Sequence, residues 1–83
     1  MDTTSVKSVT IYLEKKFAVI NFEDHKTTIQ VNENSTILYS YESKATAWLE
    51  KFETLEALLL DNRLSLLDKW VARGMLGIPL TEK

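Results

Sequence analysis

The only histidine of the chain, His25, follows Glu23 and Asp24 in a polar break between two apolar segments. Imidazole and carboxylate groups could together ligate a divalent metal or exchange protons near neutral pH. Consecutive side chains on an extended backbone point to opposite faces, however, so these three groups are not expected to converge. We interpret them as polar residues that solvate an exposed turn, and we predict no metal site, no cofactor and no catalytic residue.

Other catalytic arrangements lack the residue types that they need. The chain has no cysteine, and Gly74 and Gly77 are its only glycines, so thiol chemistry and glycine-rich phosphate loops are excluded. Its serines lie in no nucleophile-elbow context. The sequence therefore does not favour an enzyme.

Three glutamates recur at every third position, at Glu50, Glu53 and Glu56. On a helix they would form an acidic stripe that could dock a basic partner. A lysine interrupts the stripe, and charged runs are usually solvated helix faces, so we interpret the glutamates in that way. Glu56 lies nearest the predicted apolar face and could pair with Arg63 or Lys69.

Tyrosines and lysines indicate a different kind of binding surface. Aromatic side chains on an open sheet can stack nucleobases while lysines contact phosphates. The candidates are Lys7, Tyr12, Lys15, Lys16, Tyr39 and Tyr41. Because the net charge is −2 and only one basic pair is adjacent, single-stranded nucleic-acid binding is the alternative hypothesis and not the leading one.

A sheet must position these residues in the N-terminal half. Apolar and polar residues alternate over 9–13, a more apolar run follows over 17–22, and alternation resumes over 27–31 and 36–41. β-branched and aromatic residues dominate all of these segments. We predict an antiparallel meander of four strands. The segment 14–17 lacks the Gly or Asn of a tight hairpin, so a single bent strand and a three-stranded sheet remain open.

The hydrophobic period becomes helical after residue 42. Ser43 is a candidate N-cap, and the apolar residues of one helical face follow it: Ala45, Trp48, Leu49, Phe52, Leu55 and Leu59. Ser65 and Asp68 have the spacing of a capping box at the start of a second helix. Two glycines and Pro79 would end that helix.

Strands followed by helices predict an α+β fold with the two C-terminal helices packed on one face of the sheet. The 83 residues allow one domain: a frayed N-terminus over 1–6, the β-meander over 8–42, the helical pair over 43–76 and a C-terminal tail over 77–83. Neither a signal-peptide pattern nor an apolar segment of membrane-spanning length is present, so we expect a cytoplasmic protein with no membrane partner.

The helical half contains more apolar residues than two amphipathic faces require. Those left over form a candidate interface for a partner or a dimer: Leu58, Leu60, Leu66, Trp70, Leu76 and Ile78. Leftover apolar patches mark interfaces, and two-fold dimers are the commonest oligomers. We therefore expect a small non-catalytic interaction, regulatory or inhibitor module that forms a homodimer and binds an unidentified protein. Alternatively, Leu58 and Leu66 only widen the contact between the helices, and Ile78 and Leu80 fold back on Trp70.

Overall fold

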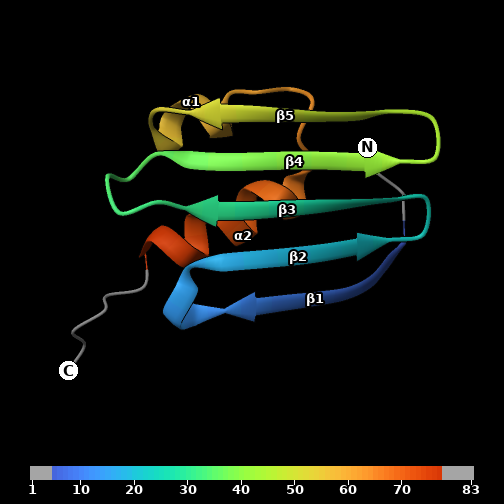
Figure 1. The fold of residues 1–83 in the computed structure, drawn as a ribbon, viewed down its shortest axis with the longest axis horizontal. Coiled ribbons are helices and arrows are strands. Elements are labelled where there is room, and N and C mark those ends of the chain that lie inside the picture. Colours follow the sequence, from blue (N-terminus) through green and yellow to red (C-terminus); the bar gives the residue numbers. More distant parts are fainter. Residues whose placement is uncertain (1–4, 78–83) are drawn as a thin grey trace.

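A computed structural model describes residues 5–77 as an antiparallel sheet followed by two helices (Figure 1). The five strands are β1 (Val6–Tyr12), β2 (Phe17–Phe22), β3 (His25–Val31), β4 (Ile37–Ser43) and β5 (Ala47–Phe52). The helices are the 3-10 turn η1 (Leu13–Lys15), α1 (Leu55–Leu59) and α2 (Leu66–Gly77). Each strand lies beside its neighbours in the chain, in the order β1-β2-β3-β4-β5. The predicted α+β fold, a meander followed by two helices that contact it, is confirmed.

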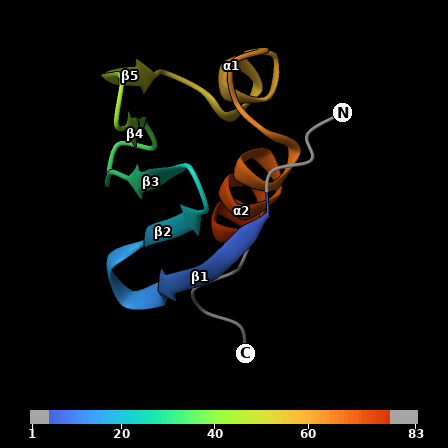
Figure 2. The same cartoon turned by 90° about the vertical axis from the view of Figure 1, so that its right-hand side faces the viewer.

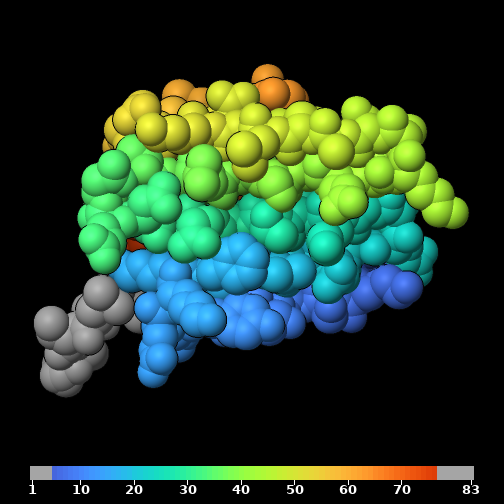
Figure 3. All heavy atoms as spheres, in the orientation of Figure 1, coloured from blue at the N-terminus to red at the C-terminus, as the bar shows by residue number. Residues whose placement is uncertain are grey.

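The molecule has two layers, with all strands in one layer and both helices in the other (Figure 2). Helix α2 contacts β3, and α1 contacts both β5 and α2. No described helix crosses the opposite face of the sheet, which Figure 3 shows as a surface of strand side chains. We call the two sides of the sheet the covered face and the open face.

The hydrophobic core lies between the covered face and the helices. Alternation along each strand directs every second side chain into it, as the buried residues of β2 and β3 show. The buried apolar residues are Ala18, Ile20, Phe22, Ile29, Val31, Ile37, Tyr39, Phe52, Leu58, Leu64, Val71, Ala72 and Met75. Most of them come from the three central strands and from α2, so the core is deepest under the middle of the sheet.

The first hairpin turns through η1, which resolves the choice between one long strand and two. Lys16 follows this turn with φ 50°, and its N–H donates to the carbonyl oxygen of Leu13 at 3.2 Å. A left-handed residue is normally glycine or asparagine, and this hairpin places a lysine there instead. The segment 14–17 therefore lacks Gly and Asn because a strained lysine occupies the left-handed position of the turn, and not because the strand continues through it.

The prediction of a helix from residue 43 onward was wrong for 47–52, which form β5. Trp48, Glu50 and Phe52 lie on the covered face, opposite Tyr41, Tyr39 and Ile37 of β4. The charged residue Glu50 lies between Trp48 and Phe52 on the covered face, so it interrupts the alternation of apolar and polar residues that predicts a strand. Because of β5, the sheet has five strands and not the predicted four.

The residues that cap the turns also differ from the prediction. The Ser43 hydroxyl accepts hydrogen bonds from the N–H groups of Ala45 and Thr46, so it closes the β4–β5 turn and not a helix. Thr54 is the N-cap of α1 and accepts from the Ala57 N–H at 3.1 Å. Helix α1 is consequently a short element, and α2 carries most of the helical layer.

Candidate functional site

One buried carboxylate fastens the start of α2 to the sheet. The predicted capping box is present, since the Asp68 N–H donates to Ser65 Oγ at 3.2 Å and the Ser65 N–H donates to Asp68 Oδ2 at 3.1 Å. The same carboxylate accepts hydrogen bonds from the hydroxyls of Thr27 on β3 at 2.7 Å and Tyr39 on β4 at 2.8 Å. The three-residue spacing between Ser65 and Asp68 predicted the cap, but no local pattern indicated the two bonds from the sheet.

This network is structural in character. Burial, and then the adjacent negative charge of Asp68, raise the pKa of the Tyr39 hydroxyl above its ordinary value. The hydroxyl therefore stays protonated and continues to donate to the carboxylate. Within residues 5–77, every buried side-chain nitrogen or oxygen has a hydrogen-bond partner. The bonds of the network hold the start of α2 against β3 and β4.

A row of rings crosses the covered face at one end of the sheet. His25 stacks on Phe22 with ring centroids 4.2 Å apart and on Tyr41 at 4.8 Å. Tyr41 stacks in turn on Trp48 at 5.7 Å, and the Arg63 guanidinium lies 4.4 Å from the Trp48 ring centroid. The row links strands β2 to β5 and ends in a cation–π contact.

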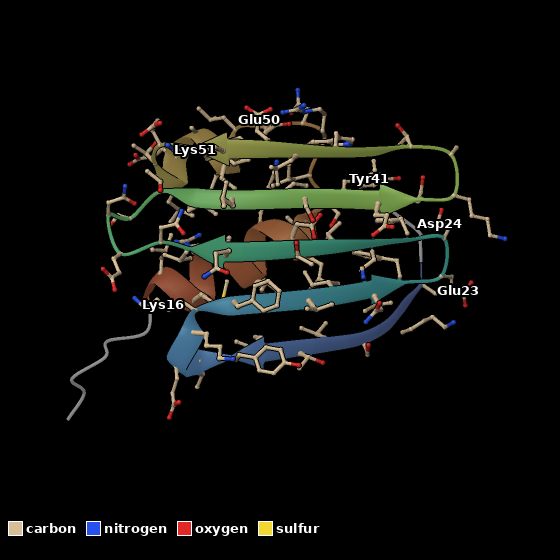
Figure 4. All side chains as sticks on the ribbon, in the orientation of Figure 1. Lys16, Glu23, Asp24, Tyr41, Glu50 and Lys51 are labelled. Atoms are coloured by element: carbon tan, nitrogen blue, oxygen red, sulfur yellow. The ribbon has the colours of Figure 1, made fainter. Side chains whose placement is uncertain are left out.

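The expectation that His25 solvates an exposed turn was wrong. Its side chain is only 11% exposed, and Nδ1 lies 2.6 Å from Asp24 Oδ1. The residue shares the covered face with Thr27 and Ile29 because all three are odd-numbered positions of β3. Asp24 and Glu23 occupy the turn itself (Figure 4), and among the described residues no cluster of three His, Asp or Glu side chains could hold a metal.

A cavity of about 350 Å³ adjoins this row of rings. It is lined by Asp24, His25, Tyr39, Tyr41, Asn62, Arg63, Leu64, Ser65 and Asp68. Its acidic and basic side chains pair with one another or with neighbours, as Asp24 does with His25 and Asp68 with Tyr39. The cavity combines acid, base and aromatic groups, but their bonds hold the turn, the helix start and the strands together. We therefore assign no reaction to it.

The acidic stripe expected on one helix does not form. Glu50 lies on β5, Glu53 follows that strand, and only Glu56 belongs to α1. Arg63 binds Glu50 at 3.0 Å, in place of the expected contact with Glu56, and also binds Asp61 through Nε at 2.9 Å. The bonds from Arg63 lower the pKa of the Asp61 carboxyl below its usual value. These acidic groups therefore fix the connection between α1 and α2 against β5.

The candidate interface on the helices divides into buried and exposed residues. Leu58 is fully buried in the core, and Leu76 is half-buried and packs against it. The assignment of Leu58 to an interface was wrong because its side chain lies inside the core, whereas Leu76 keeps part of its surface exposed. Leu60, Leu66 and Trp70 are exposed. Ile78 lies outside the described residues.

Helix α2 presents an apolar pair to solvent. Leu66 is 68% exposed and Trp70 is 71% exposed. They are four residues apart, so they lie on one helical face, opposite the buried Asp68. Lys69 and Arg73 are four residues apart and lie along one side of this pair. We call these four residues the α2 face, which is apolar at its centre and basic beside it.

A second apolar surface, which was not expected, lies on β1. Val6, Val9 and Ile11 pair with Phe22, Ile20 and Ala18 of β2, so they lie on the covered face. They are nevertheless 43%, 41% and 41% exposed. The period of two identified their common face correctly, but it gave no indication that the helices stop short of it. We call these three residues the β1 strip.

The candidate nucleic-acid residues do not share one surface. Tyr39 is buried and Tyr41 lies half-buried in the row of rings, both on the covered face. Tyr12 lies on the open face beside Phe17, with ring centroids 6.0 Å apart. Of the lysines, Lys7 and Lys15 are exposed, and Lys16 is half-buried at the η1 turn (Figure 4). Among residues 5–77, the open face of the sheet therefore carries one aromatic pair, Tyr12 and Phe17.

No protein-family model, no curated protein and no solved structure matches this chain. Within residues 5–77, no helix has the length and apolar character needed to cross a membrane. The fold and the surfaces described above define the chain as a small α+β domain, and any function must be argued from those surfaces.

Proposed function

We propose that this chain is a small, non-catalytic interaction module that regulates or inhibits another protein by binding it through the α2 face. The observation that carries this proposal is the exposure of Trp70, a large aromatic residue, at the centre of a described helix. Tryptophan is the residue type most enriched among side chains that dominate binding energy. A neighbouring exposed leucine extends the same apolar surface.

The flanking charges suggest the chemistry of the partner. Lys69 and Arg73 lie beside the apolar pair, and no ion pair joins either of them to a described acidic residue. A partner surface with an apolar centre and carboxylates at its rim would complement both features. Rim charges mainly affect the rate of association, so binding should weaken as the salt concentration rises.

Two variants and a matched control test this role. Leu66→Glu and Trp70→Ala change the α2 face, whereas Leu49→Glu changes another exposed leucine, which is 66% exposed on β5. A host protein that the wild type and Leu49→Glu capture should be lost with both α2 variants. The purified partner should then bind Trp70→Ala about tenfold or more weakly by calorimetry. Equal affinity for all four proteins would exclude the α2 face.

Fluorescence gives an independent reading of the same contact. The chain has two tryptophans, so Trp48→Phe leaves Trp70 as the only indole. Its emission should be that of a hydrated indole in the free protein and should shift to shorter wavelength when the partner is added, because binding excludes water from the ring. An unchanged emission spectrum at saturating partner would place the interface elsewhere.

Single-stranded nucleic acid is the alternative ligand, supported by the Tyr12–Phe17 pair on the open face. Stacking on this pair would make binding sensitive to Tyr12→Ala and to salt. Fluorescence anisotropy with a labelled oligonucleotide at low salt tests it. Lack of binding under those conditions would eliminate this alternative.

A further inference from the structure

The two edges of the sheet are protected to different degrees. Strand β5 carries two charged residues, Glu50 and Lys51, at one edge of the sheet, and Arg63 binds Glu50 and lies over Trp48 on its covered face. At the opposite edge, β1 pairs with β2 on one side, and no described strand pairs with its other side. Exposed backbone N–H and C=O groups on such an edge are a template for pairing with another strand.

The sequence of β1 does little to prevent such pairing. A bulge between Val6 and Ser8 interrupts the ladder at one end, where the exposed Lys7 lies. The remaining segment 8–12 has the sequence Ser-Val-Thr-Ile-Tyr, with regular pairing to β2 and with no charge, no proline and no glycine. Edge strands usually carry at least one such protective residue along their length. This segment is therefore competent to accept another strand.

Exposed apolar side chains concentrate at the same edge. Of the nine large hydrophobic residues that are exposed in the described part of the chain, five lie between residues 6 and 13. Three of them form the β1 strip, which continues the core-facing surface of the sheet beyond the cover of α2. An edge strand and an uncovered apolar strip at one place indicate an interface that extends the sheet and its core together.

We propose that β1 pairs antiparallel with β1 of a second copy of this chain, around a two-fold axis at Thr10. Thr10 is the midpoint of the bulge-free segment 8–12, so this register pairs the whole segment through the N–H and C=O groups that point away from β2. It places Val9 of one copy opposite Ile11 of the other on the covered face, and Ser8 opposite Tyr12 on the open face. Apolar residues then meet apolar residues, and no like charges face each other in the paired segment.

The two-fold axis also explains why the strand that pairs with β1 comes from a second copy of this chain. An axis perpendicular to the sheet keeps the helices of both copies on the same side, so the two β1 strips meet and cover each other between the helical layers. Pairing of β1 with β5 of another copy would not close and would build filaments, but the charged residues Glu50 and Lys51 of β5 oppose such pairing. The difference between the edges therefore selects a closed dimer.

The molecular mass of the wild type and of variants in the two edge strands, measured by analytical ultracentrifugation, tests the proposal. The wild type should sediment at about twice the monomer mass of 9.6 kDa at tens of micromolar. Thr10→Asp brings two carboxylates together at the axis and should give a monomer with an unchanged circular dichroism spectrum, since Thr10 is exposed on the open face. Leu49→Asp, on the opposite edge, should remain a dimer. A monomeric wild type, or a Thr10→Asp dimer, would overturn the proposal.

Cross-linking locates the axis independently of mutational damage. The chain has no cysteine, so a single introduced thiol is unique in each copy. A short bifunctional thiol reagent should couple Thr10→Cys into covalent dimers in high yield, and should leave Leu49→Cys monomeric on a denaturing gel. Dimers from Leu49→Cys but not from Thr10→Cys would place the contact at the other edge and refute the register.

The β1 dimer does not depend on the α2 face, and the experiments separate the two proposals. Leu66→Glu should lose the protein partner and keep the dimer mass, whereas Thr10→Asp should lose the dimer. If Leu66→Glu were monomeric, the dimer contact would lie on the helices and the β1 proposal would fail.

Discussion

The hydroxyl of Tyr39 donates a hydrogen bond to the carboxylate of Asp68 at 2.8 Å, inside the core. Tyr39 is at the centre of β4, and Asp68 is in the first turn of α2, so this bond joins the two layers at their middle. Thr27 of β3 binds the other carboxylate oxygen at 2.7 Å. The carboxylate that caps the helix therefore also sets the position of the helix on the sheet.

Loss of this carboxylate should be the most damaging single polar change in the chain. Asp68→Ala keeps the bond from its backbone N–H to Ser65 Oγ but removes the other half of the capping box, at a cost of about 1 kcal/mol, and leaves the hydroxyls of Thr27 and Tyr39 buried without an acceptor, at a further cost of about 1–3 kcal/mol each. Urea denaturation should show a loss of about 3 kcal/mol or more. Glu56→Ala, on the exposed side of α1, is the control and should change stability by less than about 0.5 kcal/mol. Equal effects would show that the network contributes little.

Alkaline pH should weaken the fold through Tyr39. The folded state raises the pKa of its hydroxyl, so the unfolded chain releases this proton near pH 10 while the folded chain keeps it. Stability is fully present below about pH 10 and falls as pH rises above that value. Tyr39→Phe should lower stability at neutral pH by about 1.5–3 kcal/mol and flatten the alkaline slope. Denaturation curves at pH 8 to 11 for both proteins would check the sign, and identical slopes would contradict it.

The first hairpin should become more stable when its strained residue is replaced. Lys16 has φ 50°, which costs a residue with a side chain about 1–2 kcal/mol and costs glycine nothing. Glycine loses more entropy on folding, so we expect Lys16→Gly to gain about 0.5–1 kcal/mol. Lys15→Gly, at a position without positive φ, should instead lose a similar amount. Thermal unfolding compares the two, and destabilisation by both would show that the turn is not strained.

Two leucines from the predicted helical interface should respond in opposite ways to the same change. Leu58→Glu places a charge in the core and should prevent folding, because an unpaired buried carboxylate is expensive. Leu66→Glu changes an exposed residue and should keep the wild-type circular dichroism spectrum and a melting temperature within a few degrees. Cooperative folding of Leu58→Glu would show that α1 is not part of the core.

The sequence was sufficient to predict strands followed by two helices, and the capping box, because both depend on local spacing. It was insufficient for β5, where Glu50 lies on the covered face and pairs with Arg63, a residue thirteen positions away. This ion pair stabilises Glu50 on a face where an alternating strand pattern would place an apolar residue. Trp48 and Phe52 therefore matched a helical period by coincidence.

The β1 strip was missed for a different reason. Alternation shows which residues share a face, but it does not show whether another element covers that face. Five strands at a spacing of about 4.8 Å are wider than a helix about 10 Å in diameter. Because α2 packs against β3, it does not reach the side chains that β1 directs to the same face of the sheet, and these stay exposed. The exposed β1 strip thus results from the difference in width between the sheet and the helical layer, and this difference is known only once the complete fold is known.

The position of α2 after all five strands has a consequence for synthesis on the ribosome. Each hairpin pairs neighbouring segments, so the sheet can assemble strand by strand as the chain emerges. Its core-facing side chains remain in contact with water until residues 66–77 have also been made. Until α2 docks, the apolar face of the nascent sheet can therefore pair or aggregate with other chains. The rate at which α2 docks sets the length of that period.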